Sequence, residues 1–208
     1  MPKKMIDNIR WLGHDGFCVS GSKVVYFDPW EISGGPKADI ICISHEHYDH
    51  CSPEDVEKIS KGDTVIVTES LAAEKLSGQV RILKPGESLE IGGIRVTGVP
   101  SYNIGKSFHP KSNEWLGFIV EMDGVKIYHA GDSDLIPEMK DLEVDIALVP
   151  VSGTYVMDVN QAIEAARVIR PKIAVPMHYG RIVGSDDDAR KFAEALKDEM
   201  TVVLKQKE

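Results

Sequence analysis

The stretch Ser44-His45-Glu46-His47-Tyr48-Asp49-His50 places four potential metal ligands within six consecutive positions. Imidazole and carboxylate groups are the side chains that hold zinc, manganese or iron in proteins. Without a cation, such a crowded set would be costly to bury, because charged imidazoles repel and polar atoms remain unpaired. The stretch therefore predicts a metal site; the alternative is a polar surface loop that happens to be rich in histidine.

The flanking residues favour a structured site. Residues 38–44 form a nearly unbroken apolar run, which predicts a strand buried on both faces. Ser52-Pro53-Glu54-Asp55 is typical of a helix start, with Ser at the N-cap and Pro at the first helical position. The ligands thus leave the carboxyl end of a buried strand, where open α/β sheets usually place their sites. His45 and His47 point the same way in an extended loop, so Asp49 and His50 can face a second metal.

The composition is that of an ordinary globular protein. The 208 residues suffice for one large domain or two small ones, and we expect a single domain over 1–208. The net charge of -9 argues against a nucleic-acid partner but permits a small anionic substrate at a cationic metal. Cys18, Cys42 and Cys51 predict no disulfide framework. No apolar run approaches the ~20 residues of a membrane span, so we expect a cytoplasmic protein that has no membrane-spanning segment. A homo-oligomer remains open.

Hydrophobic patterns and turn residues predict a mixed order of strands and helices along the chain. Strands are expected at residues 7–13, 16–20, 23–28, 38–44, 80–83, 88–91, 94–99, 116–122, 125–129, 146–149, 173–176 and near 202. Helices are expected at residues 53–61, 69–77, 135–140, 159–169 and 186–196. The polar stretch 101–114 is long enough to be a functional loop.

An internal echo links the two halves of the chain. Three apolar runs of the first half are similar to three of the second half in the same order, residues 24–27 to 125–128, 39–43 to 145–149, and 64–67 to 172–175. Two similar halves with outer helices predict an α/β fold in four layers, an αββα sandwich of two facing sheets. The site should then lie along the edge that the sheets share.

Further ligands for a two-metal centre occur at other predicted strand ends. His109 lies in the long loop, where an exposed histidine without a role is the alternative. Asp132 follows Gly131 after a buried strand; it could bridge two cations or cap a helix. His178 follows a strand end at the position that the echo predicts in the second half.

With these residues the chain resembles the metallo-β-lactamase-fold hydrolases. Their signature is His-x-His-x-Asp-His, then a lone His, a lone Asp after a Gly, and a final His. The similarity extends from Trp11-Leu12-Gly13-His14 to Met177-His178-Tyr179. Together with Asp28-Pro29 and residues 128–132, it is strongest to the branch of L-ascorbate-6-phosphate lactonase and N-acyl-phosphatidylethanolamine phospholipase D.

The resemblance implies two divalent metal ions per chain, Zn or Mn, with Fe as an alternative. His45, His47 and His109 would hold the first metal, Asp49, His50 and His178 the second, and Asp132 would bridge them. A hydroxide between the metals would be the nucleophile, because a bound cation lowers the pKa of water to about 7. Asp49, which could orient or deprotonate that water, and Asp132 are the expected catalytic residues.

Four other residues have weaker expected roles. Asp28, at a strand end, is expected to support a ligand histidine from behind, with a turn cap as the alternative. His14 either lines the site or is structural, and His129, inside a strand, is expected to pack there or to support a ligand from behind. Lys106 is a candidate for binding an anionic substrate group.

The favoured function is a metal-dependent hydrolase for a small phosphorylated, lactone or ester substrate. β-Lactamase activity is not expected, because the antibiotic-degrading branches commonly differ at the position of Asp132. One alternative is a phosphodiesterase for a small molecule, lipid or nucleic acid; the acidic charge and the lack of a basic arm disfavour RNA processing. Another is an iron-containing sulfur dioxygenase, which shares these ligands. Diiron flavoproteins carry Glu where this chain has His47, and a non-catalytic relative would not need the complete ligand set.

Overall fold

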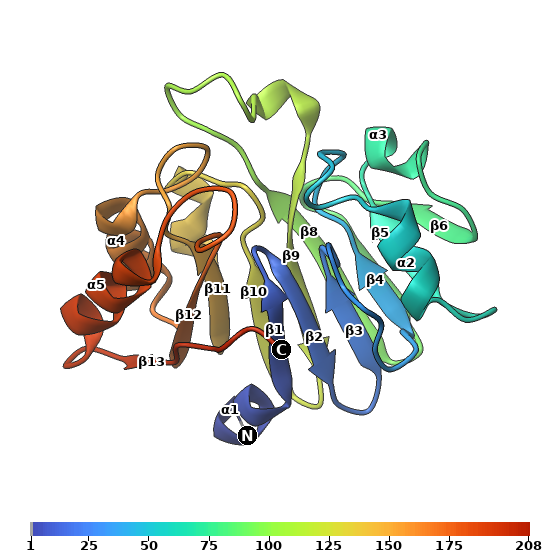
Figure 1. Ribbon diagram of the computed structural model, residues 1–208, viewed down its shortest axis with the longest axis horizontal. Helices are drawn as coiled ribbons and strands as arrows, with labels where there is room; N and C mark the ends of the chain where they lie inside the picture. The colour runs from blue at the N-terminus through green and yellow to red at the C-terminus, as the bar shows by residue number, and fades with distance from the viewer. Residues whose placement is uncertain (1) are drawn as a thin grey trace.

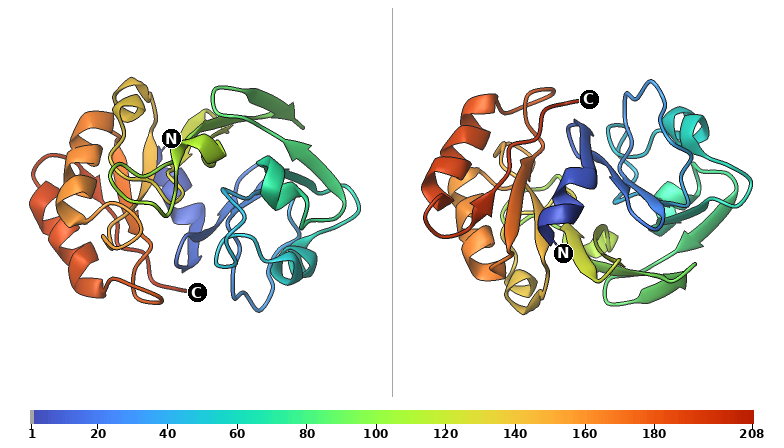
Figure 2. Two further views of the ribbon diagram at one scale, coloured as in Figure 1. Left: turned by 90° about the horizontal axis from the view of Figure 1, so that it is seen from above. Right: turned by 90° about the horizontal axis from the view of Figure 1, so that it is seen from below.

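Two β-sheets face each other in the computed structural model, which describes residues 2–208, and helices cover their outer faces (Figures 1 and 2). The first sheet contains, in spatial order, β1 (Ile9–Gly13), β2 (Gly16–Ser20), β3 (Val24–Phe27), β4 (Ile40–Cys42), β5 (Val65–Thr68) and β6 (Gln79–Ile82). The second contains β13 (Thr201–Val202), β12 (Ile173–Met177), β11 (Ile146–Pro150), β10 (Val125–His129), β9 (Leu116–Met122), β8 (Ile94–Pro100) and β7 (Ser88–Ile91).

The internal echo corresponds to equivalent strands of the two sheets. β3, β4 and β5 pair in parallel in the first sheet, as β10, β11 and β12 do in the second. In each sheet an antiparallel pair precedes these three strands: β1 and β2 in the first sheet, and β8 and β9 in the second. The expected αββα sandwich of two similar halves is therefore confirmed.

Side-chain caps begin two of the helices, and the one at Ser52 is the cap that the sequence predicts. Ser52 Oγ accepts a hydrogen bond from Asp55 N at the start of α2 (Pro53–Ile59), and Asp158 forms a capping box at the start of α4 (Val159–Ile169). The remaining helical segments are α1 (Pro2–Met5), η1 (Ile6–Asn8), α3 (Ser70–Ala73), η2 (Lys111–Asn113), η3 (Pro137–Asp141) and α5 (Asp186–Leu196). Within residues 2–208, none of these helices combines the length and apolarity of a membrane span.

Three predicted elements differ from the structure. Residues 7–8 belong to η1, so the first strand starts only at Ile9. The helix predicted over 69–77 is limited to α3. The helix predicted over 135–140 is the 3-10 segment η3, which Pro137 opens because proline has no N–H to continue a preceding helical turn.

The strands alternate between two apolar layers. Val25 and Phe27 face the core between the sheets, whereas Tyr26 faces a second cluster beneath α2. Ile41 and Ile43 face that second cluster as well, and their neighbours in β4 face the central core. The prediction that this strand is buried on both faces is therefore confirmed.

A matched pair of carboxylates anchors the two halves. Asp39 and Asp145 directly precede β4 and β11, and each accepts a backbone N–H from the neighbouring strand and pairs with a lysine. The distances are 2.8 Å to Val24 N and 2.7 Å to Lys61 Nζ for Asp39, and 2.9 Å to Lys126 N and 2.6 Å to Lys172 Nζ for Asp145. Partial burial acts to raise the pKa of Asp145, but these two partners lower it below the usual value.

We expect Asp145→Asn to destabilise the protein by about 1 kcal/mol near pH 7, because the charged hydrogen bond is lost. A carboxylate whose pKa is lower in the folded than in the unfolded state stabilises the folded protein at pH values above the unfolded pKa. This contribution to the free energy of unfolding is lost as the pH falls through the folded pKa. Urea unfolding at several pH values should therefore show the difference from the wild type shrinking below about pH 4. Asp141→Asn, at an exposed position, is the control. A difference that is the same at pH 7 and at pH 2 would contradict this account.

Candidate metal centre

The predicted ligands gather where strands of both sheets end. Asp28 follows β3, residues 45–50 follow β4, Asp132 follows β10 and His178 follows β12. His14 lies in the tight turn between β1 and β2. The long loop after β8, green at the upper edge of Figure 1, contributes His109.

Three histidines form a first group. His45 Nε2 lies 3.0 Å from His47 Nδ1, and the ring of His109 has its centroid 5.2 Å from both of theirs. One ring nitrogen of each lies within 4.8 Å of the others. Burial lowers the pKa of His45 and His47, which keeps these imidazoles neutral, the form that binds metals. Trp115 packs against all three rings.

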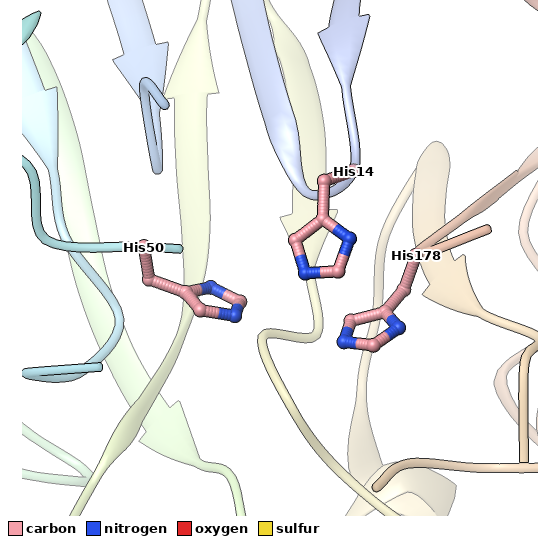
Figure 3. A group of neighbouring side chains, drawn as sticks. All are labelled: His14, His50 and His178. Carbon is pink, nitrogen blue, oxygen red and sulfur yellow. The ribbon is translucent and has the colours of Figure 1, made fainter. Parts of the chain in front are cut away.

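A second group lies beside the first. Figure 3 shows the rings of His14, His50 and His178 converging from three different segments of the chain, and their nitrogens lie within 4.8 Å of one another. The ring centroids of His14 and His178 are 4.0 Å apart. All three side chains are buried.

Asp132 lies between the two groups and directs one oxygen toward each. Its Oδ2 is 3.2 Å from His109 Nε2, whereas its Oδ1 is 3.3 Å from His50 Nε2 and 3.4 Å from His178 Nε2. Two ligands at ~2.1 Å from one tetrahedral metal lie roughly 3.4 Å apart. Moreover, Asp132 Oδ1, His50 Nε2 and His109 Nε2 are buried, and none of them has a hydrogen-bond partner among residues 2–208. These donors fit two divalent cations that share the Asp132 carboxylate.

The charges of the second group also favour a cation. Burial alone would lower the pKa of His50 and His178, but the Asp132 carboxylate raises both, that of His178 to about 9. Burial would conversely raise the pKa of Asp132, yet the two histidines hold it well below its usual range. The interior at this point therefore attracts positive charge.

Four of the histidines are fixed from behind by their other ring nitrogen. This hydrogen bond sets the tautomer and leaves Nε2 free for a metal. The partners of Nδ1 are Ser44 Oγ at 2.9 Å for His45, Asp28 Oδ2 at 2.8 Å for His50, Asn103 Oδ1 at 3.1 Å for His109, and Ser152 Oγ at 2.8 Å for His178.

Asp28 lies directly behind the ligand loop. Its Oδ1 accepts from Ser44 N at 2.7 Å, and its Oδ2 accepts from Ser44 Oγ at 2.6 Å as well as from His50. The residue is fully buried and has a φ of 38°, an uncommon value for a residue other than glycine. Asp28 therefore binds the Nδ1 side of His50, one of the predicted ligands.

Within the second group, Asp49 lies closer to His14 than to His50. Its Oδ2 is 3.1 Å from His14 Nε2 and 3.9 Å from His50 Nε2. Burial lowers the pKa of His14 to about 4, so its neutral ring donates Nε2–H to the Asp49 carboxylate. With 14% of its side chain exposed, Asp49 is the carboxylate of this cluster that reaches solvent.

Lys106 and His129 do not belong to either of the two histidine groups, although a nitrogen of His129 lies within 4.8 Å of Asp15 and Asp28. Lys106 Nζ is bound to Asp134 Oδ1 and to Val156 O, both at 2.6 Å, so it holds the long loop in place instead of presenting a free ammonium to a substrate. His129 is buried in β10, stacked on Phe27, as expected for a packing residue.

Several residues of the site have no recognisable sequence signal. Asn103 and Ser152 come from separate loops and meet their histidines only in the folded chain. Ser44 is adjacent to the histidine segment but has the appearance of the last residue of a strand. Asp15 lies in a glycine-rich turn, where Asp is common for local reasons.

A cleft of about 480 Å³ adjoins the metal cluster at His14. Its walls include the aromatic rings of Trp11, Trp30 and Tyr179, and Lys207 of the C-terminal segment. This volume is typical of a pocket for a small molecule.

Comparisons with known proteins agree with this architecture. A model of the beta-lactamase superfamily domain matches residues 8–178. A UPF0173 metal-dependent hydrolase of Thermoplasma acidophilum is 38% identical over 193 residues, 82% of each chain, and one of Archaeoglobus fulgidus is 31% identical over 95% of each. The crystal structure of a Parabacteroides distasonis protein, 35% identical, has a TM-score of 0.84 and covers 95% of this chain and 91% of that one. The chain therefore belongs to the metallo-β-lactamase superfamily and, within it, to the UPF0173 family of metal-dependent hydrolases.

Proposed function

We propose that this protein is a hydrolase with two divalent metal ions, acting on a small phosphorylated, lactone or ester substrate. The observation that carries the proposal is the position of Asp132, whose two oxygens face two separate groups of buried histidines. A carboxylate shared in this way suits paired cations rather than a single one.

The first group supplies the ligands of one metal, whereas in the second group Asp49 takes the place of His14, whose Nε2 is bonded to Asp49. His45, His47 and His109 would hold the first ion. His50 and His178, with Asp49 at the solvent side, would hold the second. Zn and Mn are both compatible with imidazole and carboxylate donors.

When bound, the two cations would lower the pKa of a water and stabilise negative charge on the substrate oxygen. The chain supplies orientation and a proton acceptor. His14 holds Asp49 by a hydrogen bond from Nε2, and Asp49 is thereby positioned as a charged base at the solvent side of the cluster. Asp49 is accordingly the residue that takes a proton from water and returns it to the leaving group.

The cleft beside His14 supports a small substrate. Its volume admits a molecule of a few rings or a short chain, and its aromatic walls can cover an apolar part of it. Lys207 lies on the same cleft and can bind a phosphate or carboxylate group. The closer relationship to lactonase or phospholipase D relatives stays a prediction.

Metal analysis of the purified protein tests the proposal. We expect about two Zn or Mn ions per chain, hydrolysis of bis-p-nitrophenyl phosphate or of a member of a lactone panel, and loss of activity on chelation. His47→Ala should lose the first metal and reduce activity by about a hundredfold or more, because one of three imidazole ligands is removed. Full metal content and activity in this variant would contradict the assignment, and a single redox-active iron per chain would favour the dioxygenase alternative.

Asp28→Asn tests the support behind the ligand loop. An amide cannot accept all three hydrogen bonds that the carboxylate receives, so His50 loses its fixed orientation. We expect metal affinity to fall roughly 10- to 100-fold, measured by competition with a chelator, with kcat recovering when metal is in excess. Unchanged affinity would show that Asp28 only caps a turn. Asp55→Asn, at a buried carboxylate in the first turn of α2, is the matched control.

A further inference from the structure

Asp15 occupies the tip of the hairpin between β1 and β2, next to the metal cluster. The hairpin loop consists of His14 and Asp15, because Gly13 pairs with Gly16. A side chain on Gly16 would approach the carbonyl oxygens of Gly13 and Asp28, at 3.1 and 3.3 Å, which keeps this turn tight. The backbone of the tip is also anchored, since His129 donates Nε2–H to Asp15 O at 2.8 Å and His178 N donates to His14 O.

The Asp15 side chain has none of the usual partners of a turn aspartate. In turns, an aspartate commonly accepts a hydrogen bond from a nearby backbone N–H. Here the residue is fully buried, and neither carboxylate oxygen has a hydrogen-bond partner among residues 2–208. Burying a carboxylate in this way is unfavourable unless a cation or a set of donors compensates it.

Two sets of potential metal ligands include this carboxylate. One ligand atom each of Asp15, His50, Asp132 and His178 lies within 4.8 Å of the others, and Asp28 and His129 form a second such set with Asp15. Asp15 Oδ2 is 3.9 Å from His50 Nδ1, beyond hydrogen-bond distance, and that nitrogen is already bonded to Asp28. One oxygen of Asp15 therefore lies within 4.8 Å of an oxygen of Asp132, whose Oδ1 also lacks a hydrogen-bond partner among residues 2–208.

We propose that Asp15 is an additional ligand of the second metal and that it raises the affinity of this site for Mn²⁺ relative to its affinity for Zn²⁺. The inference rests on the proposed two-metal function and extends the ligand set that the superfamily resemblance implies. Asp15, Asp49 and Asp132 provide three carboxylates, and His50 and His178 provide two imidazoles. Five such donors leave one position for water in a six-coordinate shell, which manganese adopts and zinc in proteins seldom does.

The first metal site lacks the additional carboxylates of the second site. Its donors are the three imidazoles of His45, His47 and His109 with one oxygen of Asp132. Three nitrogens and one oxygen match the tetrahedral geometry of zinc. The two sites should therefore differ in metal preference although they share a carboxylate.

The test compares Asp15→Asn with the wild type, and Asp55→Asn serves as the matched control. Asp55 is also a buried aspartate, but its oxygens accept Glu31 N and Ile32 N, and it lies in none of the groups of potential metal ligands. Each protein is stripped with a chelator and titrated with Mn²⁺ and Zn²⁺, alone and in competition. Metal content is measured by mass spectrometry, and urea unfolding is followed with and without metal.

For Asp15→Asn we expect the affinity of the second site for Mn²⁺ to fall roughly tenfold or more, as it does when a metal ligand or its supporting residue is lost. The ratio of Zn²⁺ to Mn²⁺ bound at that site should rise. The metal-free variant should unfold at the same or higher urea concentration as the metal-free wild type, because a neutral amide needs no counter-charge. Asp55→Asn should instead lose stability equally with and without metal, and keep its metal content.

Two results would overturn the inference. The first is an Asp15→Asn protein with wild-type Mn²⁺ affinity and Mn/Zn preference. The second is a variant whose metal-free form is markedly less stable or does not fold, because Asp15 would then be structural. If the wild-type protein binds fewer than two metals per chain, the proposed function itself is contradicted. This outcome is recognised from the wild type alone, without any variant.

Discussion

The arrangement of the candidate metal centre depends on the Asp132 carboxylate, around which the two histidine groups lie. This carboxylate must reach the space between two histidine groups with one oxygen toward each, and the end of β10 brings it there. Gly131 makes this approach feasible: its φ is 59°, and a side chain at this position would lie 2.8 Å from Leu116 O in the neighbouring strand. The shared carboxylate thus requires a close contact between backbones, which glycine alone permits without strain.

Around this carboxylate, two features fix the candidate ligands: hydrogen bonds to the far side of the histidine rings, and backbone conformations with positive φ. Ser44, Asp28, Asn103 and Ser152 each bind the outer nitrogen of a histidine, so the rings cannot rotate or change tautomer freely. His14, Asp28 and His178 have positive φ values, which are unfavourable for residues with a side chain. Such conformations persist because the two sheets hold the strand ends rigidly. The stability of the sandwich therefore supports a preorganised group of donors.

The sequence predicts much of the fold because local and long-range preferences agree. The apolar runs at 39–43 and 145–149 have the length of buried strands, and the structure confirms them as central parallel strands in the two sheets. The errors lie where local signals are weak: the helix over 69–77 is limited to four residues, and the one over 135–140 is a 3-10 turn. Lys106 illustrates a different limit. Its charge made it a candidate for binding substrate, but Asp134, distant in the sequence, engages it.

The sequence by itself determined the two-sheet architecture and the residue types of a metal site, because hydrophobic periodicity and the spacing of ligands are local properties of the chain. Only the tertiary structure decided which atoms face a common centre. It showed that Asp132 divides its oxygens between two groups, and that Asn103 and Ser152 fix the ligands. It also showed that Asp15, in an ordinary hairpin turn, has two buried carboxylate oxygens that lack hydrogen-bond partners within residues 2–208. These relations join residues from different strand ends, and only the folded sheets bring them together.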